Sequence, residues 1–248
     1  MKIIKINQEK NHEVQYKNGF IDEVVLNLDK RLIILLFYLI YKFQNENAIE
    51  ITISEIKKKM GLSREKIKVI DNLINKLYDQ KVYYKNKELI ETEEIRINVN
   101  DYIKDHLFDI LVLSNDKNTL KFVLKKRYID YFKNFKNKFT TITLEHFKNL
   151  TSTEILIYIY LNRWKEYGNE VENNWEIFKL NMGFSNGYRN NDIIRKLDKG
   201  LINIERQTGI QASYKLIKSR NKRKIEKIIF KINNEGGRIR WKKKKYKN

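Results

Sequence analysis

The 248-residue sequence contains no cysteine and no proline. Without cysteine it can form neither disulfides nor thiolate-bound zinc sites, so the fold must depend on a hydrophobic core. The longest strongly apolar stretch, Leu32 to Ile40, is too short for a membrane span, which needs about 20 residues. The first residues lack the apolar run of a signal peptide. We therefore expect a cytoplasmic protein with no membrane partner.

Motifs for catalysis are also missing. No GxxxxGK[ST] loop for a nucleotide is present. His12, His106 and His146 are far apart in the sequence, unlike the paired histidines that hold a metal in enzymes that nick DNA at rolling-circle origins. We expect no catalytic residues, no metal and no cofactor. The sequence leaves open an active site assembled from distant residues.

Positive charge is what the sequence has in excess. The chain has 51 Lys and Arg against 31 Asp and Glu, a net charge of +20. Lys215 to Lys247 alone holds 15 basic and 2 acidic residues, so +13 of the excess lies there. An AT-rich genome would explain the many Asn, Ile and Lys residues, but not this clustering. The charge predicts attraction to a polyanion: DNA, RNA or an acidic membrane surface.

Two segments resemble each other at a constant offset of 122 residues. IKKKMGLS, from Ile56, aligns with FKLNMGFS, from Phe178. LNLDKRLIILLFYLI, from Leu26, aligns at the same offset with KNLTSTEILIYIYLN, from Lys148. Two gapless matches at one offset predict an internal duplication.

Each copy predicts three helices in the same order. The expected helices are 29–42, 53–59 and a longer one opened by Ser63 in the first copy, and 153–164, 175–181 and a longer one opened by Ser185 in the second. Thr151, Ser152 or Thr153 is expected to cap the helix at 153–164. Gly61 and Gly183 follow the short helices, where glycine tolerates the left-handed conformation that ends a helix.

Strand-like segments follow the helices in both copies. In the second copy, the apolar residues alternate on both sides of a basic turn, as in a hairpin with one buried face; they are Tyr214, Leu216, Ile228, Phe230 and Ile232. The first copy offers KVYYKNKELIETEEIRINV, from Lys81. Its acidic residues would be repelled by phosphate, so we expect them to face solvent or protein, for example a dimer interface; they are Glu88, Glu91, Glu93 and Glu94.

Three helices followed by a hairpin is the order of a winged helix-turn-helix. We therefore predict the α+β class, with two tandem winged helix-turn-helix domains related by internal duplication. Between the copies, FDILVLS and TLKFVLKK read as strands around NDKN, and KRYIDYFKNFKNKF reads as a helix. The expected domains are 1–138, a winged helix for DNA contact and dimerisation; 139–236, a DNA-binding winged helix; and 237–248, a basic tail. No Pro- or Gly-rich linker separates the halves, so we expect close contact between them.

FTTITLEHFKNLTSTEILIYIYLNRW, from Phe139, resembles the segment that enters the second domain of the winged-helix plasmid replication initiators, the iteron-binding Rep proteins of theta-replicating plasmids. The resemblance covers most of the chain and continues through Gly183, Tyr188, Leu197, Ile202, Ile204 and the basic hairpin. The absence of proline and the long basic tail depart from the family pattern. The resemblance implies two winged-helix domains, binding to direct repeats at an origin, and repression of the protein's own gene as a homodimer.

The expected DNA contacts lie at four places, each of which has an ordinary solvated surface as its alternative. A recognition helix places its amino-terminal residues at base edges, where Arg pairs with guanine and Asn with adenine. The candidates there are Tyr188, Arg189, Asn190, Asn191 and Arg195 in the second copy, and Arg64, Lys66, Lys68 and Asn72 in the first. The candidates in the second wing are Lys218, Arg220, Lys222, Arg223 and Lys224, and those in the tail are Arg238, Arg240, Lys242 and Lys243.

These observations favour a sequence-specific initiator that binds double-stranded DNA at origin repeats, promotes opening of nearby AT-rich DNA and recruits host replication proteins such as a helicase or the host initiator. Three other interpretations remain open from sequence: a winged-helix repressor, a rolling-circle nicking endonuclease, and an RNA-binding protein that uses the basic tail.

Overall fold

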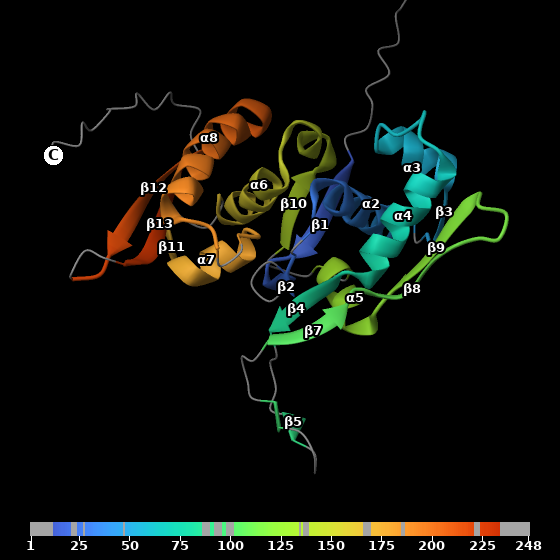
Figure 1. Ribbon diagram of the computed structural model, residues 1–248, viewed down its shortest axis with the longest axis horizontal. Helices are drawn as coiled ribbons and strands as arrows, with labels where there is room; N and C mark the ends of the chain where they lie inside the picture. The colour runs from blue at the N-terminus through green and yellow to red at the C-terminus, as the bar shows by residue number, and fades with distance from the viewer. Residues whose placement is uncertain are drawn as a thin grey trace, which may run out of the picture.

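The computed structural model describes residues 12–20, 24–26, 28–46, 48–85, 90–91, 96–97, 102–133, 135, 139–165, 170–184, 187–220 and 224–233. It mixes helices and sheets, as the predicted α+β class requires. Figure 1 shows α2, α3 and α4 with their sheets on one side and α7, α8 and the last sheet on the other. Strands β1 and β10 and helix α6 lie between these two parts.

The N-terminal part contains the three helices that the spacing of its apolar residues predicts. The helices are α2 (Lys30–Glu46), α3 (Ile53–Lys59) and α4 (Ile67–Asp79). Thr52 caps α3 by accepting a hydrogen bond from the Glu55 N–H. Gly61 follows with φ of 68°, the left-handed conformation that lets the chain reverse without a Cβ penalty. This confirms the short helix and the glycine turn.

The prediction that Ser63 opens the long helix is wrong. The Glu65 N–H donates to the Leu62 carbonyl, so 62–65 forms a turn of its own. Lys66 is extended, with φ of −65° and ψ of 151°, and α4 begins only at Ile67. The buried Leu62 fixes this turn against the core, which delays the start of the helix.

The sheets of the N-terminal part differ from the predicted hairpin. Strand β4 (Lys81–Lys85) pairs with β2 (Val24–Val25) and β7 (Tyr102–His106), while β5 (Ile90–Glu91) and β6 (Arg96–Ile97) pair only with each other. Alternating apolar and polar residues within 81–99 suggested that β4 pairs with the segment that follows it. Its actual partner β7 was not recognised as a strand, because the sequence of β7, YIKDH, is largely polar. The predicted acidic residues Glu88, Glu93 and Glu94, and the side chain of Glu91, fall outside the described residues.

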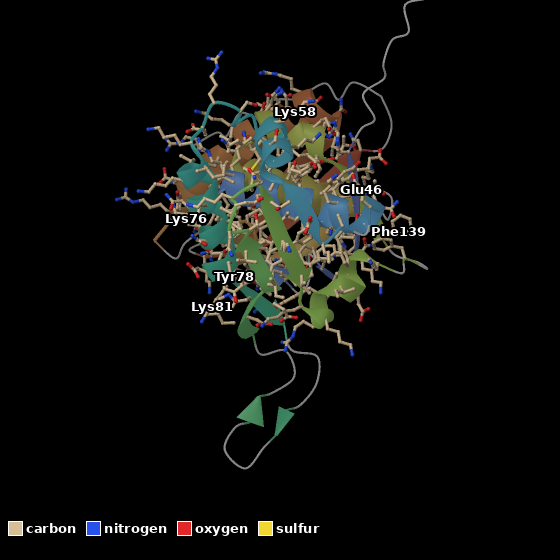
Figure 2. All side chains as sticks on the ribbon, turned by 90° about the vertical axis from the view of Figure 1, so that its right-hand side faces the viewer. Glu46, Lys58, Lys76, Tyr78, Lys81 and Phe139 are labelled. Carbon is tan, nitrogen blue, oxygen red and sulfur yellow. The ribbon has the colours of Figure 1, made fainter. Side chains whose placement is uncertain are left out.

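The hairpin predicted between the two copies belongs to the N-terminal part. Strands β8 (Phe108–Leu113) and β9 (Thr119–Leu124) form around the expected turn, and β9 also pairs with β3 (Glu50–Thr52). Helix α5 (Lys126–Phe132) is shorter than predicted, because Lys133 is already extended. Figure 2 views this end of the molecule, with Lys76, Tyr78 and Lys81 along one side and Glu46 and Phe139 on the other.

The C-terminal part repeats the order of helices. It contains the 3₁₀ helix η1 (Leu144–Asn149), α6 (Ser152–Trp164), α7 (Trp175–Asn181) and α8 (Asn190–Thr208). Thr151 is the cap of α6 and forms a capping box with Glu154. Gly183 has φ of 72°, as predicted. Ser185 lies outside the described residues, and α8 begins at Asn190 with Arg189 as its N-cap, so Ser185 does not open the helix.

The last sheet has the order β11–β13–β12. Strands β12 (Gln211–Lys218) and β13 (Ile225–Asn233) form the predicted hairpin, with Ile228, Phe230 and Ile232 fully buried. Strand β11 (Glu170–Asn174) was not predicted, because its sequence, EVENN, carries one apolar residue only. It pairs with β13 and places Trp175 at the start of α7.

The two parts share one core, which confirms that they abut. Strand β1 (Glu13–Lys17) from the N-terminal end pairs with β10 (Phe139–Thr143). The Tyr16 hydroxyl donates to the Ile159 carbonyl in α6 at 3.1 Å, and the rings of Phe37 and Phe147 meet edge to face at 5.5 Å. The N-terminal and C-terminal parts are thus joined by strand pairing as well as by side-chain contacts.

A polar cluster also joins the parts and gives a pH-dependent prediction. Glu145 of η1 lies 2.8 Å from His12 Nδ1 and 3.1 Å from Lys59 Nζ. Burial alone would raise the pKa of Glu145, but the hydrogen bonds from its own backbone, Lys59 and His12 lower that pKa below its ordinary value. A carboxylate whose pKa is lowered on folding stabilises the protein above its unfolded-state pKa, and this contribution is lost as the pH falls through the folded pKa.

Glu145→Gln is therefore expected to lower the free energy of unfolding at neutral pH, and with it the thermal unfolding midpoint. The loss should be about 1 kcal/mol or less, because the contacts of Glu145 with His12 and Lys59 are partly solvated. The difference from the wild type should vanish at about pH 2, where both side chains are neutral. Glu13→Gln, on the neighbouring strand, is the control. An equal destabilisation at both pH values would show that the ion pair is not the cause.

Candidate nucleic-acid interface

Helix α8 has one buried face and one exposed face. The buried face consists of Ile193, Leu197, Gly200, Leu201 and Ile204. The opposite face, which we call the α8 outer face, consists of exposed residues three or four positions apart: Asn191, Arg195, Lys199, Ile202 and Arg206. Gly200 packs so closely on α6 that an added Cβ would lie 3.3 Å from Glu154 Cγ, so the buried face is firmly seated. The outer face is thus presented to solvent along about four turns.

Arg189 stands at the N-cap of α8 and is exposed. Its carbonyl accepts the Asp192 and Ile193 N–H groups, which fixes its backbone at the start of the helix. Within the described part of the chain, its guanidinium has no hydrogen-bond or ion-pair partner. Its donors are therefore available to a base or phosphate.

Arg195 lies on the α8 outer face but is already paired. Its Nη2 is 2.9 Å from Asp192 Oδ1, one turn earlier in the helix. The pair is solvated, since the Arg195 side chain is 70% exposed, and such pairs contribute little to stability. Asp192 nevertheless cancels one charge, so Arg195 is a weaker candidate for base contact than Arg189.

The two predicted asparagines have different surroundings. The indole N–H of Trp175, which is 1% exposed, donates to Asn190 Oδ1 at 3.0 Å. This bond ties the first residue of α8 to α7, so the Asn190 amide oxygen faces the protein. Asn191 lies on the outer face, and no described residue bonds its amide. Asn191 therefore fits the adenine contact better than Asn190 does.

Tyr188 forms an aromatic cluster just before α8. Its ring meets Phe184 edge to face at 5.6 Å, and Lys196 Nζ lies 4.4 Å above it while donating to its hydroxyl at 3.0 Å. A cation over an aromatic ring stabilises this arrangement by roughly 0.5–1 kcal/mol at an exposed site. These contacts thus hold Tyr188 against Phe184 and against Lys196 of α8.

Trp175→Phe tests whether the start of α8 must be held for specificity. The variant keeps an aromatic ring over Phe178, where the wild-type rings stack at 5.8 Å, but it removes the donor to Asn190. We expect affinity for a specific site to fall about tenfold, with little change for random duplex, because misplaced base contacts act only on specific binding. Competition titrations would measure both. Trp164→Phe in α6 is the control; an equal decrease on both DNAs would contradict a positioning role.

The DNA contacts predicted in the N-terminal part lie at or near the start of α4. Arg64 and Lys66 precede α4, and Lys68 and Asn72 lie one turn apart on its exposed face, opposite the buried stripe. Lys57 donates through Nζ to the Glu65 carbonyl and so holds the turn that carries Arg64. The exposed Glu65 beside Arg64 and Lys66 partly offsets the positive charge at this place.

The basic wing lies beside α8. Its tip is closed by the Ser219 N–H donating to the Lys224 carbonyl at 2.8 Å, and Lys218, Arg220 and Lys224 are exposed around it. The Tyr214 hydroxyl of β12 donates to Asp198 of α8 at 2.7 Å, so the hairpin is held against the helix. Six predicted contacts fall outside the described residues: Lys222, Arg223, Arg238, Arg240, Lys242 and Lys243.

Three outer-face residues were not predicted from the sequence: Lys199, Ile202 and Arg206. The spacing of three or four residues from Asn191 onward was the signal that could have found them. Among the described residues, no group of three or more His, Asp or Glu could hold a metal ion. Within that same part of the chain, no helix has the length and apolar character of a membrane span.

Comparisons with known proteins agree with this architecture. The sequence model of the family described as "Initiator Replication protein, WH1" matches residues 13–161, more than half of the chain. The structure is similar to that of the Pi initiator protein in complex with iteron DNA, with a TM-score of 0.55 and 17% identity over 90% of this chain and 98% of that one. Domains 2–3 of RctB match with a TM-score of 0.42 and 14% identity over 82% and 80%. No curated protein sequence matches.

Proposed function

The chain belongs to the family of initiator replication proteins, as its sequence resemblance predicted, and from this premise we propose that it binds direct repeats at a plasmid origin as a sequence-specific double-stranded DNA-binding protein. The observation that carries the proposal is that the hairpin bearing the basic wing is fastened to α8, the helix that presents the exposed outer face, by the hydrogen bond from Tyr214 to Asp198. A helix fits the major groove, and an adjacent cationic hairpin fits the phosphates that flank it.

The fold shared with the Pi initiator, whose structure is a complex with iteron DNA, supports the same mode of binding. We further propose that the two helix orders, α2–α3–α4 and α6–α7–α8, are two winged helices that arose by duplication, with domains 1–138 and 139–236. Each would place the start of its third helix in a major groove. The tail, 237–248, would add affinity for phosphate.

We propose that the remaining steps of initiation depend on this binding. Bound at adjacent repeats, the protein would strain and open neighbouring AT-rich DNA in the cytoplasm and recruit a host helicase or initiator. As a homodimer it would repress its own gene. It would do no covalent chemistry, since the proposed surface consists of donors and cations and requires neither a metal nor a cofactor.

Binding titrations would test the proposal. A duplex with the direct repeats found next to the gene is expected to bind at least about 1,000-fold more tightly than random duplex. Equal affinity for both would exclude a specific initiator and favour a generic polycation or an RNA-binding protein. Permanganate sensitivity of the AT-rich segment would separate an initiator from a pure repressor, and a metal-dependent nick in supercoiled DNA would favour the endonuclease.

A further inference from the structure

The α8 outer face carries one large apolar side chain among polar ones. Ile202 is 54% exposed, while Leu201 just before it and Ile204 two residues after it are buried. Along the outer face, Lys199 and Arg206 flank it, and both are exposed. The core therefore does not require an isoleucine at this position, and a solvated basic helix face would ordinarily carry a polar residue there.

A DNA major groove offers one apolar group at its base edges. Each base pair presents donors and acceptors there, and thymine alone adds the C5 methyl group. Ile202 lies 11 residues after Asn191 on the same face, a distance of about 16 Å along the helix. A helix that lies along the groove would keep both residues near base edges, while Lys199 and Arg206, turned about 40–60° to one side of Ile202 around the helix axis, approach the phosphates at that side of the groove.

We infer that Ile202 is a specificity-determining residue that contacts a thymine methyl group within the bound repeat. This inference rests on the proposed function and adds to it the identity of one base. A protein partner fits less well, because the charged Lys199 and Arg206 on either side would have to be desolvated. The neighbouring exposed apolar residues, Ile177 and Leu180, lie on α7 rather than on this face.

Replacing thymine by uracil tests the contact, because it removes the methyl group and nothing else. Each thymine in the repeat would be replaced in turn, and the full-length chain titrated with every duplex. For the wild type, uracil at one position, or two adjacent ones, should weaken binding about fourfold, as expected for one buried methyl group. Ile202→Ala should bind the thymine and uracil versions of that position equally, and about as weakly as the wild type binds uracil.

Ile49→Ala provides the matched control, since Ile49 is 63% exposed and lies in the N-terminal part. It should keep the fourfold preference for thymine. Ile202→Val, which retains a branched apolar side chain, should still bind the thymine version at least about twofold more tightly than the uracil version. The inference is overturned if no uracil substitution weakens wild-type binding, or if Ile202→Ala still prefers thymine at every position. A wild type that fails to distinguish the repeat from random duplex would instead contradict the proposed function itself.

Discussion

Replacing Lys218, Arg220 and Lys224 by alanine is expected to weaken binding to every duplex, whatever its sequence. These cations surround the tip of the wing and are exposed. Removing one phosphate contact should reduce the slope of log K against log salt by about 0.9, so removing three should reduce it by about 2.7. Between about 50 and 200 mM salt, the affinity of the wild type should then fall about 40-fold more than that of the variant.

The control removes three exposed cations from the N-terminal part of the molecule: Lys81, Lys117 and Lys126, of which Lys81 is labelled in Figure 2. Both triple variants have the same net charge, so a general effect of charge would change both slopes equally. A slope that falls only in the wing variant locates the phosphate contacts at the wing. An unchanged slope in the wing variant would show that the wing does not touch the DNA backbone.

Arg189→Ala is expected to remove discrimination between the repeat and random duplex. A bidentate contact between arginine and guanine is worth about 1–3 kcal/mol of specificity, or about 5- to 150-fold. Affinity for the repeat should fall by that factor, while affinity for random duplex should fall only by the small effect of one charge. Competition binding at constant salt would measure the ratio of the two affinities.

Two variants sharpen this test. Arg195→Ala should have the smaller effect, because Asp192 already holds that guanidinium. Arg31→Ala, which removes an exposed arginine from the start of α2, controls for charge alone. If Arg195→Ala removed more discrimination than Arg189→Ala, the Asp192 pair would have to break on binding, and the assignment of Arg189 would be wrong.

The sequence predicted most of the helices because their apolar residues recur at helical spacing. The bounds of α3 and α7 agree with the prediction, and both glycine turns have the expected left-handed conformation. The starts of α4 and α8 were placed too early, because serine is a common cap and the mostly exposed turn after Gly61, anchored by Leu62 alone, leaves no periodic signal. Strands β7 and β11 were missed because they are short and polar, and pairing with distant partners makes them strands.

The sequence predicted which types of residue lie at the candidate interface, but not which of their side chains are already bonded to other protein groups. The sequence placed arginines and asparagines at the start of α8, and the pair of Asp192 with Arg195 could have been recognised from its spacing of three residues. The bond from Trp175 to Asn190 could not, because it joins two helices whose packing angle no local pattern gives. These contacts move the base-contacting roles toward Arg189 and Asn191, which stays a prediction for binding experiments.

A footprint of the full-length chain on the origin repeats tests the central claim most directly. Two winged helices that bind one face of a duplex contact major grooves one helical turn apart, about 10 bp. Since β1 and β10 join the two parts in one sheet, both should engage together. We predict continuous protection of about 20 bp at each repeat and none on flanking random sequence. Protection of a single half-site of about 10 bp, or equal protection of random DNA, would contradict the claim that two winged helices bind the repeat together.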